Sequence, residues 1–355
     1  SACSDDDDDD LIGKWYRVSD MDGLARNYAS SFTIGNKGYL ICGNDGKNRL
    51  SDCWEYDMER DTWTQKADFP GTARNSAVAM AVDEKGYLGT GYDGTNYLND
   101  FWEFNPTTNT WAQKADFPGS GRYGAVAFGV NGKAYIGCGY DGNYLKDFYA
   151  FNPVANSWTQ TISIGGTKRQ GATSFVINGI AYVCCGQNNG EYVDDFWKFD
   201  PSKSEENKWT RLREIKDDSS DDYDDDYNSI TRTYGCAFVI DGQAYITLGQ
   251  TSGSSLRNNY WIYDPNTDLW RSSDTEDDFD YMENEDVAFV VKNPHSEEDL
   301  LIELCGEFSV FFEKWHGEYP ATEEGYAQMT QDVQAVLAAN NTSIPIYLHS
   351  KSGEL

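Results

Sequence analysis

The sequence predicts an all-β fold, a six-bladed β-propeller of four-stranded antiparallel blades, and three observations lead to it. First, tryptophans recur at intervals of 48, 48, 47, 51 and 61 residues: Trp15, Trp63, Trp111, Trp158, Trp209 and Trp270. Second, each repeated segment carries a glycine-marked hairpin between short aromatic-rich runs. Third, 15% aromatic residues and 33 glycines in 355 residues suit many short strands joined by tight turns. A period of this length is typical of a propeller or array.

The third segment shows the order of the strands within one repeat. GAVAFGV is a small apolar run suited to a crowded inner strand, and the NG pair at Asn131 and Gly132 is a strong hairpin signal. KAYIGCG follows as the second strand, and the loop YDGNYLKD leads to a third strand in FYAFNP. VANSW then turns into an outer strand at Trp158. Four antiparallel strands per repeat make one propeller blade.

The same frame recurs in GYLGTGYDGTNYLNDFWEFNPTTNTW and in GYLICGNDGKNRLSDCWEYDMERDTW. These repeats resemble Kelch repeats, whose blades carry a glycine doublet, a spaced tyrosine and a tryptophan. The resemblance covers about residues 13–306. It departs from the Kelch pattern at the first glycine of the doublet, which is replaced by Cys42, Thr90, Cys138, Cys185, Leu248 and Cys305.

The two ends of the chain are expected to share the sixth blade. Trp15 supplies an outer strand with no blade of its own in front, and DVAFVV and DLLIELCG supply inner strands without a matching tryptophan. The third strand of that blade begins either at Ser309 or at Ile344. We therefore divide the chain into a tether at 1–10, a propeller at 11–306 and a C-terminal segment at 307–355. A helix at about 322–339 in that segment either completes or decorates the sixth blade.

The strongly acidic composition excludes some partners. The chain has 59 acidic and 28 basic residues, a formal charge of −31, and such a field repels nucleic acids and anionic lipid surfaces. Acidic blocks at 5–10, 217–226 and 274–280 are predicted to be solvated runs, because they lack the spacing of a calcium loop. No run of 18 apolar residues predicts a membrane span.

Cys3 is a candidate lipidation site. It follows small residues and precedes an acidic tract, which resembles the end of a bacterial lipobox and the export tag of Bacteroidetes-type surface lipoproteins. The resemblance implies a protein anchored by lipid to the bacterial outer membrane and facing the exterior; the alternative is an untethered secreted protein. Other cysteines at equivalent repeat positions are expected to be buried and unpaired, since equivalent positions lie far apart around a ring.

The Kelch resemblance implies that the candidate binding residues lie where the repeats open on one face. An arginine precedes the inner strand of each of the first five repeats: Arg26, Arg74, Arg122, Arg169 and Arg232. The Kelch resemblance implies that arginines here hold carboxylates of a peptide or sugar acid, and a guanidinium forms a bidentate fork for them. The alternative is a structural role within the repeat. Tyr92 and Tyr140, in the long loops, suit sugar recognition, although Tyr-Asp-Gly is also ordinary turn chemistry.

The sequence favours a binding module over an enzyme. We expect it to engage a glycan, a peptide or an outer-membrane protein complex involved in uptake or assembly, with no cofactor and no metal. The alternative is a sugar-acid (sialate-type) mutarotase, an activity that some six-bladed Kelch propellers carry. A copper radical oxidase is excluded, because His295, His316 and His349 all lie in the last quarter of the chain, outside the regular repeats.

Overall fold

The computed structural model describes residues 14–216, 227, 230–251, 260–273, 287–292, 299–304 and 310–314. For residues 14–17, and from 273 onward, it describes the backbone alone. Cys3 with the predicted tether, both later acidic blocks, Cys305 and the predicted helix at 322–339 lie outside the described residues. Within the described part of the chain, no helix has the length and apolar character needed to cross a membrane.

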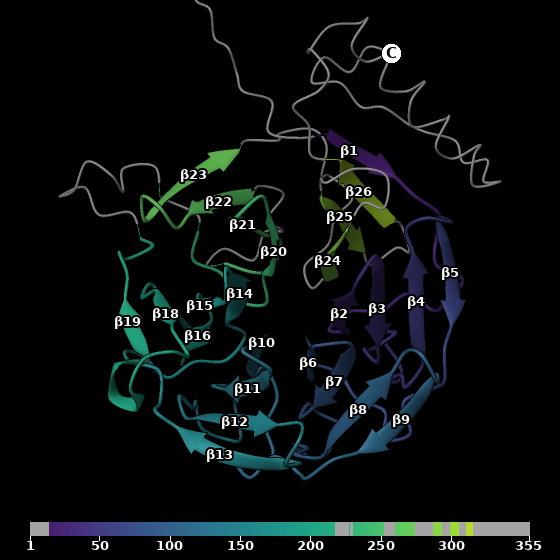
Figure 1. Ribbon diagram of the computed structural model, residues 1–355, viewed down its shortest axis with the longest axis horizontal. Coiled ribbons are helices and arrows are strands. Elements are labelled where there is room, and N and C mark those ends of the chain that lie inside the picture. The colour runs from purple at the N-terminus through teal and green to yellow at the C-terminus, as the bar shows by residue number, and fades with distance from the viewer. Residues whose placement is uncertain are drawn as a thin grey trace, which may run out of the picture.

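The strands form four-stranded antiparallel sheets arranged around a ring (Figure 1). The first three blades consist of β2 (Ser30–Ile34), β3 (Lys37–Ile41), β4 (Cys53–Asp57) and β5 (Thr62–Gln65); β6 (Val78–Val82), β7 (Lys85–Gly89), β8 (Phe101–Asn105) and β9 (Thr110–Gln113); and β10 (Val126–Val130), β11 (Lys133–Gly137), β12 (Phe148–Asn152) and β13 (Ser157–Thr161). The next two consist of β14 (Thr173–Ile177), β15 (Ile180–Cys184), β18 (Trp197–Phe199) and β19 (Trp209–Arg211); and β20 (Cys236–Ile240), β21 (Gln243–Thr247), β22 (Tyr260–Asp264) and β23 (Leu269–Ser273). The fourth repeat also carries the hairpin β16 (Gln187–Asn188) and β17 (Glu191–Tyr192) and the short helix η1 (Glu205–Asn207).

A further sheet brings the two ends of the chain together. It consists of β24 (Val287–Lys292), β25 (Asp299–Leu304), β26 (Val310–Lys314) and β1 (Lys14–Arg17). β1 pairs with β26, with Trp15 opposite Glu313, and β24 contacts both β2 and β20. The structure describes five complete blades with their side chains, whereas the sequence predicts six. The sheet formed by the two ends of the chain is described by its backbone alone. Its third strand is the one that begins near Ser309, so propeller strands extend beyond the predicted boundary at residue 306.

The inner hairpins follow from their turn residues. Both central residues of three of these turns have positive φ: Asn131 and Gly132, Asn178 and Gly179, and Asp241 and Gly242. Asn, Asp and Gly tolerate this conformation best, and the resulting turn matches the twist of the flanking strands. The predicted NG hairpin signal is confirmed.

The core lies between neighbouring blades, where the repeated tryptophans join one blade to the next. The indole nitrogens of the outer strands donate to carbonyls of the preceding repeat: Trp63 to Ser19, Trp111 to Ala67, Trp158 to Ala115 and Trp209 to Ile162. Phe101, Phe151 and Trp158 illustrate the packing, with ring centroids 4.9–5.1 Å apart. The tryptophan period is therefore the period of inter-blade contacts.

The cysteines of the glycine-doublet position are buried, as predicted. Cys42, Cys138 and Cys185 are fully buried and unpaired. Burial raises the pKa of the Cys42 and Cys138 thiols to about 12, which keeps them neutral. The Cys42 and Cys138 thiols therefore act as small apolar side chains, whereas the Cys185 thiol donates to the Ile230 carbonyl.

Candidate functional site

The five predicted arginines lie inside the blades. Arg26 is 8% exposed, and the other four are fully buried. In each blade the Nε–H donates to the carbonyl two residues earlier, and Nη1 donates to a carbonyl 16 residues later. Those later carbonyls belong to Cys42, Thr90, Cys138, Cys185 and Leu248. These five residues stand at the first position of the Kelch glycine doublet, and all have positive φ, between 57° and 63°.

An aspartate neutralises the arginine in each of the first four blades. The pairs are Arg26–Asp52, Arg74–Asp100, Arg122–Asp147 and Arg169–Asp195. In the first three pairs the nearest nitrogen and oxygen are 2.6 Å apart. In three blades an indole N–H donates to the same carboxylate: Trp54 to Asp52, Trp102 to Asp100 and Trp197 to Asp195. Burial alone would raise the pKa of Asp52 and Asp100, but hydrogen bonds from Arg26 and Arg74 hold it below its usual value.

The structure places Arg26, Arg74, Arg122, Arg169 and Arg232 inside their blades, as the structural alternative expects, and their predicted role as ligand contacts stays a prediction. Their guanidinium groups are buried, and their donors hold the doublet carbonyl and, in the first four blades, the aspartate. None of the five lines the described central cavity. The spacing from arginine to aspartate, 25 or 26 residues, and the aromatic residue two positions after the aspartate were the sequence signals of this role.

A central cavity of about 240 Å³ lies between the inner strands of the five blades. One residue of each blade lies at the end of the cavity where the inner strands begin, which we call its mouth: Tyr28, Ser76, Gly124, Gly171 and Tyr234. All five have positive φ, between 51° and 62°. The amide of each later residue donates to the carbonyl of the preceding one, over 2.8–3.1 Å, so backbone hydrogen bonds link the blades around the mouth. We call these five residues the mouth ring.

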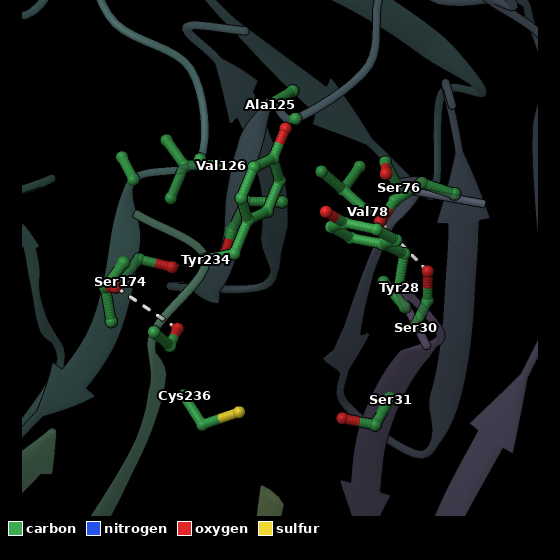
Figure 2. Close-up of a pocket in the computed structure, with 18 of the residues that line it drawn as sticks. Tyr28, Ser30, Ser31, Ser76, Val78, Ala125, Val126, Ser174, Tyr234 and Cys236 are labelled. Carbon is green, nitrogen blue, oxygen red and sulfur yellow. Dashed lines mark hydrogen bonds between the residues drawn. The ribbon is translucent and has the colours of Figure 1, made fainter. Parts of the chain in front are cut away.

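Two tyrosines of the mouth ring face each other across the cavity (Figure 2). The rings of Tyr28 and Tyr234 meet edge to face, with centroids 5.2 Å apart. The side chain of Tyr234 passes over Gly171 and reaches Gly124, where an added Cβ would lie 2.8 Å from its hydroxyl oxygen. Glycine at positions 124 and 171 therefore leaves room for the Tyr234 ring as well as accepting positive φ.

The residues just before the mouth ring are mostly polar: Asn27, Asn75, Tyr123, Gln170 and Thr233. Asn27 Oδ1 and Gln170 Oε1 are buried acceptors without a hydrogen-bond donor in the described part of the chain. Gln170 is 8% exposed and lies beside Gly124. An unpaired buried acceptor is costly, so a ligand donor at this point would be favourable.

Five tyrosines form a contiguous cluster beside the mouth on the second and third repeats. We call Tyr92, Tyr97, Tyr123, Tyr140 and Tyr144 the tyrosine cluster. Their ring centroids are 5.1–6.2 Å apart in six contacts. Tyr97 is 38% exposed and the other four are partly buried. Burial and the neighbouring tyrosines raise the pKa of Tyr123, so its hydroxyl stays protonated.

The structure therefore brings together the two tyrosines predicted as ligand contacts, and their binding role stays a prediction. Tyr97, Tyr123 and Tyr144 were missed, although Tyr97 and Tyr144 occupy the same loops as Tyr92 and Tyr140. The aspartates of these loops stabilise the turns. Asp93, for example, accepts hydrogen bonds from the amides of Thr95 and Asn96.

Arg49 is a cation in direct contact with this cluster. Its guanidinium lies over the Tyr92 ring, 4.8 Å from the centroid, and its Nε–H donates to Asn75 Oδ1 over 3.2 Å. Among the described residues, no group of three or more His, Cys, Asp or Glu side chains is placed to hold a metal ion.

Comparisons with known proteins agree with the repeat and the fold. Residues 118–294 match the KLHDC2/KLHL20/DRC7 Kelch-repeats domain, and residues 25–70 and 91–118 match the Kelch motif. Many solved structures resemble the fold. One, described as "Structure of YjhT", is 17% identical with a TM-score of 0.60, over 80% of this chain and 96% of that one. No curated protein matches the chain in sequence.

Proposed function

We propose, on the premise that this chain is a Kelch-repeat β-propeller, that it is a binding module. Its binding face consists of the mouth ring and the tyrosine cluster. It captures a protein partner or a glycan there, on a ring of six blades that the terminal sheet completes. The observation that supports this most directly is the tyrosine cluster, five contiguous rings on loops beside the cavity mouth, with Tyr97 38% exposed.

The chemistry of this face suits binding. Tyrosine rings supply large rigid contact area with little loss of conformational entropy, and their hydroxyls add hydrogen bonds. The face is also held in place: Tyr92 and Tyr123 pair through their backbones with Asn75 and Tyr140, and the mouth ring is hydrogen-bonded from blade to blade. A preorganised surface loses less entropy when a ligand binds.

The location is part of the same proposal. Cys3 carries a lipid, and the propeller is displayed on the bacterial outer membrane, where the partner is an uptake or assembly complex. The sequence around Cys3 supports this. Because an acidic protein surface is repelled by anionic lipids, membrane attachment through the lipid on Cys3 agrees with the acidic composition. Metabolic labelling with a fatty-acid probe tests it: the full-length protein should take up the label, and the Cys3→Ser variant should not.

The binding role is tested by capture. The wild-type protein and a Tyr97→Leu/Tyr140→Leu variant are each purified from native membranes, and the proteins that co-purify are identified. Both proteins are also applied to a glycan array, and the glycans that they bind are compared. We expect a stoichiometric partner or a defined glycan that the variant loses. Equal capture by both proteins would rule out this face as the binding site. Anomerisation of a sialic acid by the wild-type protein would instead favour the mutarotase alternative.

A further inference from the structure

The binding face offers hydrogen-bond acceptors. Gln170 Oε1 is buried without a donor among the described residues, and the Cβ of Gln170 lies beside Gly124, one repeat further round the ring from Tyr123. A buried acceptor of this kind is satisfied by a ligand that brings N–H groups. This points to a donor-rich ligand.

The rings of the tyrosine cluster are inclined to one another. Tyr140 makes interplanar angles of 77° with Tyr97, 66° with Tyr123 and 66° with Tyr144. Such rings offer no single flat platform to a planar ligand or a sugar ring, but they offer several faces to a compact group. One ring already holds a cation, because the Arg49 guanidinium lies over Tyr92. Cation–π attraction therefore operates within this cluster.

The charges at the edge of the cluster are acidic. Asp93 lies in the loop of Tyr92, and hydrogen bonds from the Asn96 amide and side chain lower its pKa. Asp141 lies in the same loop as Tyr140. Its slight burial would raise its pKa, but hydrogen bonds from Ser120 and Asn143 outweigh this effect, so its pKa is lowered. Arg49 sits at the first-repeat edge and is close enough to Asp93 to lower that pKa further. The nearby Arg122 guanidinium also lowers the pKa of Asp141, but Arg122 is buried and paired with Asp147. A positive charge brought by a partner would therefore be attracted to Asp141, in a chain of formal charge −31.

We propose that this face binds a basic segment of a protein partner. A lysine or arginine side chain of the partner lies against the rings of Tyr97, Tyr123 and Tyr140, close to Asp141, and the segment donates an N–H to Gln170 Oε1. This inference rests on the proposed binding function and names the chemistry of the partner. Long-range attraction to the acidic propeller also accelerates the encounter.

The test measures the affinity of the full-length protein for fluorescent peptides by anisotropy. One peptide is rich in lysine and arginine, and its control has glutamine at those positions. We expect only the basic peptide to bind, with an affinity that falls as salt is added. Tyr97→Leu/Tyr140→Leu should weaken it roughly 5- to 30-fold, while Tyr97→Phe/Tyr140→Phe, which keeps both rings, should stay within about twofold.

A pair of charge variants separates this face from general attraction. Asp141→Asn should weaken binding, whereas Asp83→Asn, in the hairpin at the opposite end of β7, should not. The inference is overturned if both peptides bind equally well. It is also overturned if the leucine and phenylalanine variants lose affinity equally, or if the two charge variants do. The absence of binding up to about 1 mM peptide overturns it as well.

The outcome also distinguishes this inference from the function it rests on. If the leucine variant loses its captured partner or glycan and basic peptide does not compete, the binding function stands and the basic partner is wrong. If capture is unchanged in the leucine variant, the function itself fails.

Discussion

The Arg74–Asp100 pair gives the sharpest prediction about stability. Asp100→Asn removes the charge opposite a guanidinium that is fully buried, while it keeps nearly the same shape. Arg74 donates to Asp100 over 2.6 and 2.8 Å, to the carbonyls of Thr72 and Thr90, and stacks 4.8 Å from the Phe69 ring centroid. It therefore cannot move to water without breaking its other contacts.

The magnitude follows from burial. Removing one partner of a buried ion pair costs about 3–5 kcal/mol, and we expect about 3 kcal/mol for Asp100→Asn because the aspartate side chain is 23% exposed. The matched control is Glu214→Gln, whose pair with Arg211 has side chains 36% and 52% exposed. Loss of a surface pair should cost less than about 1 kcal/mol.

Urea unfolding followed by tryptophan fluorescence compares the two variants with the wild type. A second arm uses pH. The pKa of Asp100 is lowered in the folded protein, so its contribution is fully present above the unfolded pKa of about 4 and is lost as pH falls through the folded value. The gap between wild type and Asp100→Asn should therefore close below about pH 4. Equal midpoints for the two variants, or a gap that does not change with pH, would refute the reasoning.

Three further changes test other parts of the repeat. Thr90→Cys should stabilise the fold by about 1 kcal/mol in thermal unfolding, because Thr90 is β-branched at φ 61° and its buried hydroxyl finds no hydrogen-bond partner among the residues that the structure describes. The reciprocal Cys138→Thr should destabilise the fold, and a loss in both directions would contradict this. Gly124→Ala should cost about 1–2 kcal/mol, since φ is +59° and the added Cβ meets the Tyr234 hydroxyl; an unchanged melting temperature would count against it. Trp111→Phe should cost at least about 1 kcal/mol by losing the 2.9 Å inter-blade hydrogen bond, and calorimetry showing no loss would argue against that role.

Much of the fold could be predicted from the sequence, because each blade repeats local signals. The tryptophan period, the NG turn and the pairing of Trp15 with the C-terminal strands all follow from patterns that neighbouring residues carry. The choice between two third strands for the terminal sheet could not be made in this way. Both candidates are short apolar runs, and only pairing with β25 and β1 distinguishes them.

The candidate site was less predictable. The five arginines have the residue type of a carboxylate-binding site, but tertiary packing buries Arg74, Arg122, Arg169 and Arg232 completely. The tyrosine cluster draws on three loop segments of two neighbouring repeats, so the sequence places Tyr92 and Tyr123 far apart while the ring of blades brings them 5.9 Å from each other.

The sequence by itself determined the repeat, the strand order within a blade and the turns between strands, because these depend on side-chain periodicity and on the φ that Gly, Asn and Asp tolerate. Only the tertiary structure decided which repeated residues are buried within the ring and which stay exposed on its face. That division depends on burial. An exposed arginine can bind the carboxylate of a ligand, whereas a buried arginine stabilises its own blade when an aspartate and a carbonyl of that blade accept its hydrogen bonds.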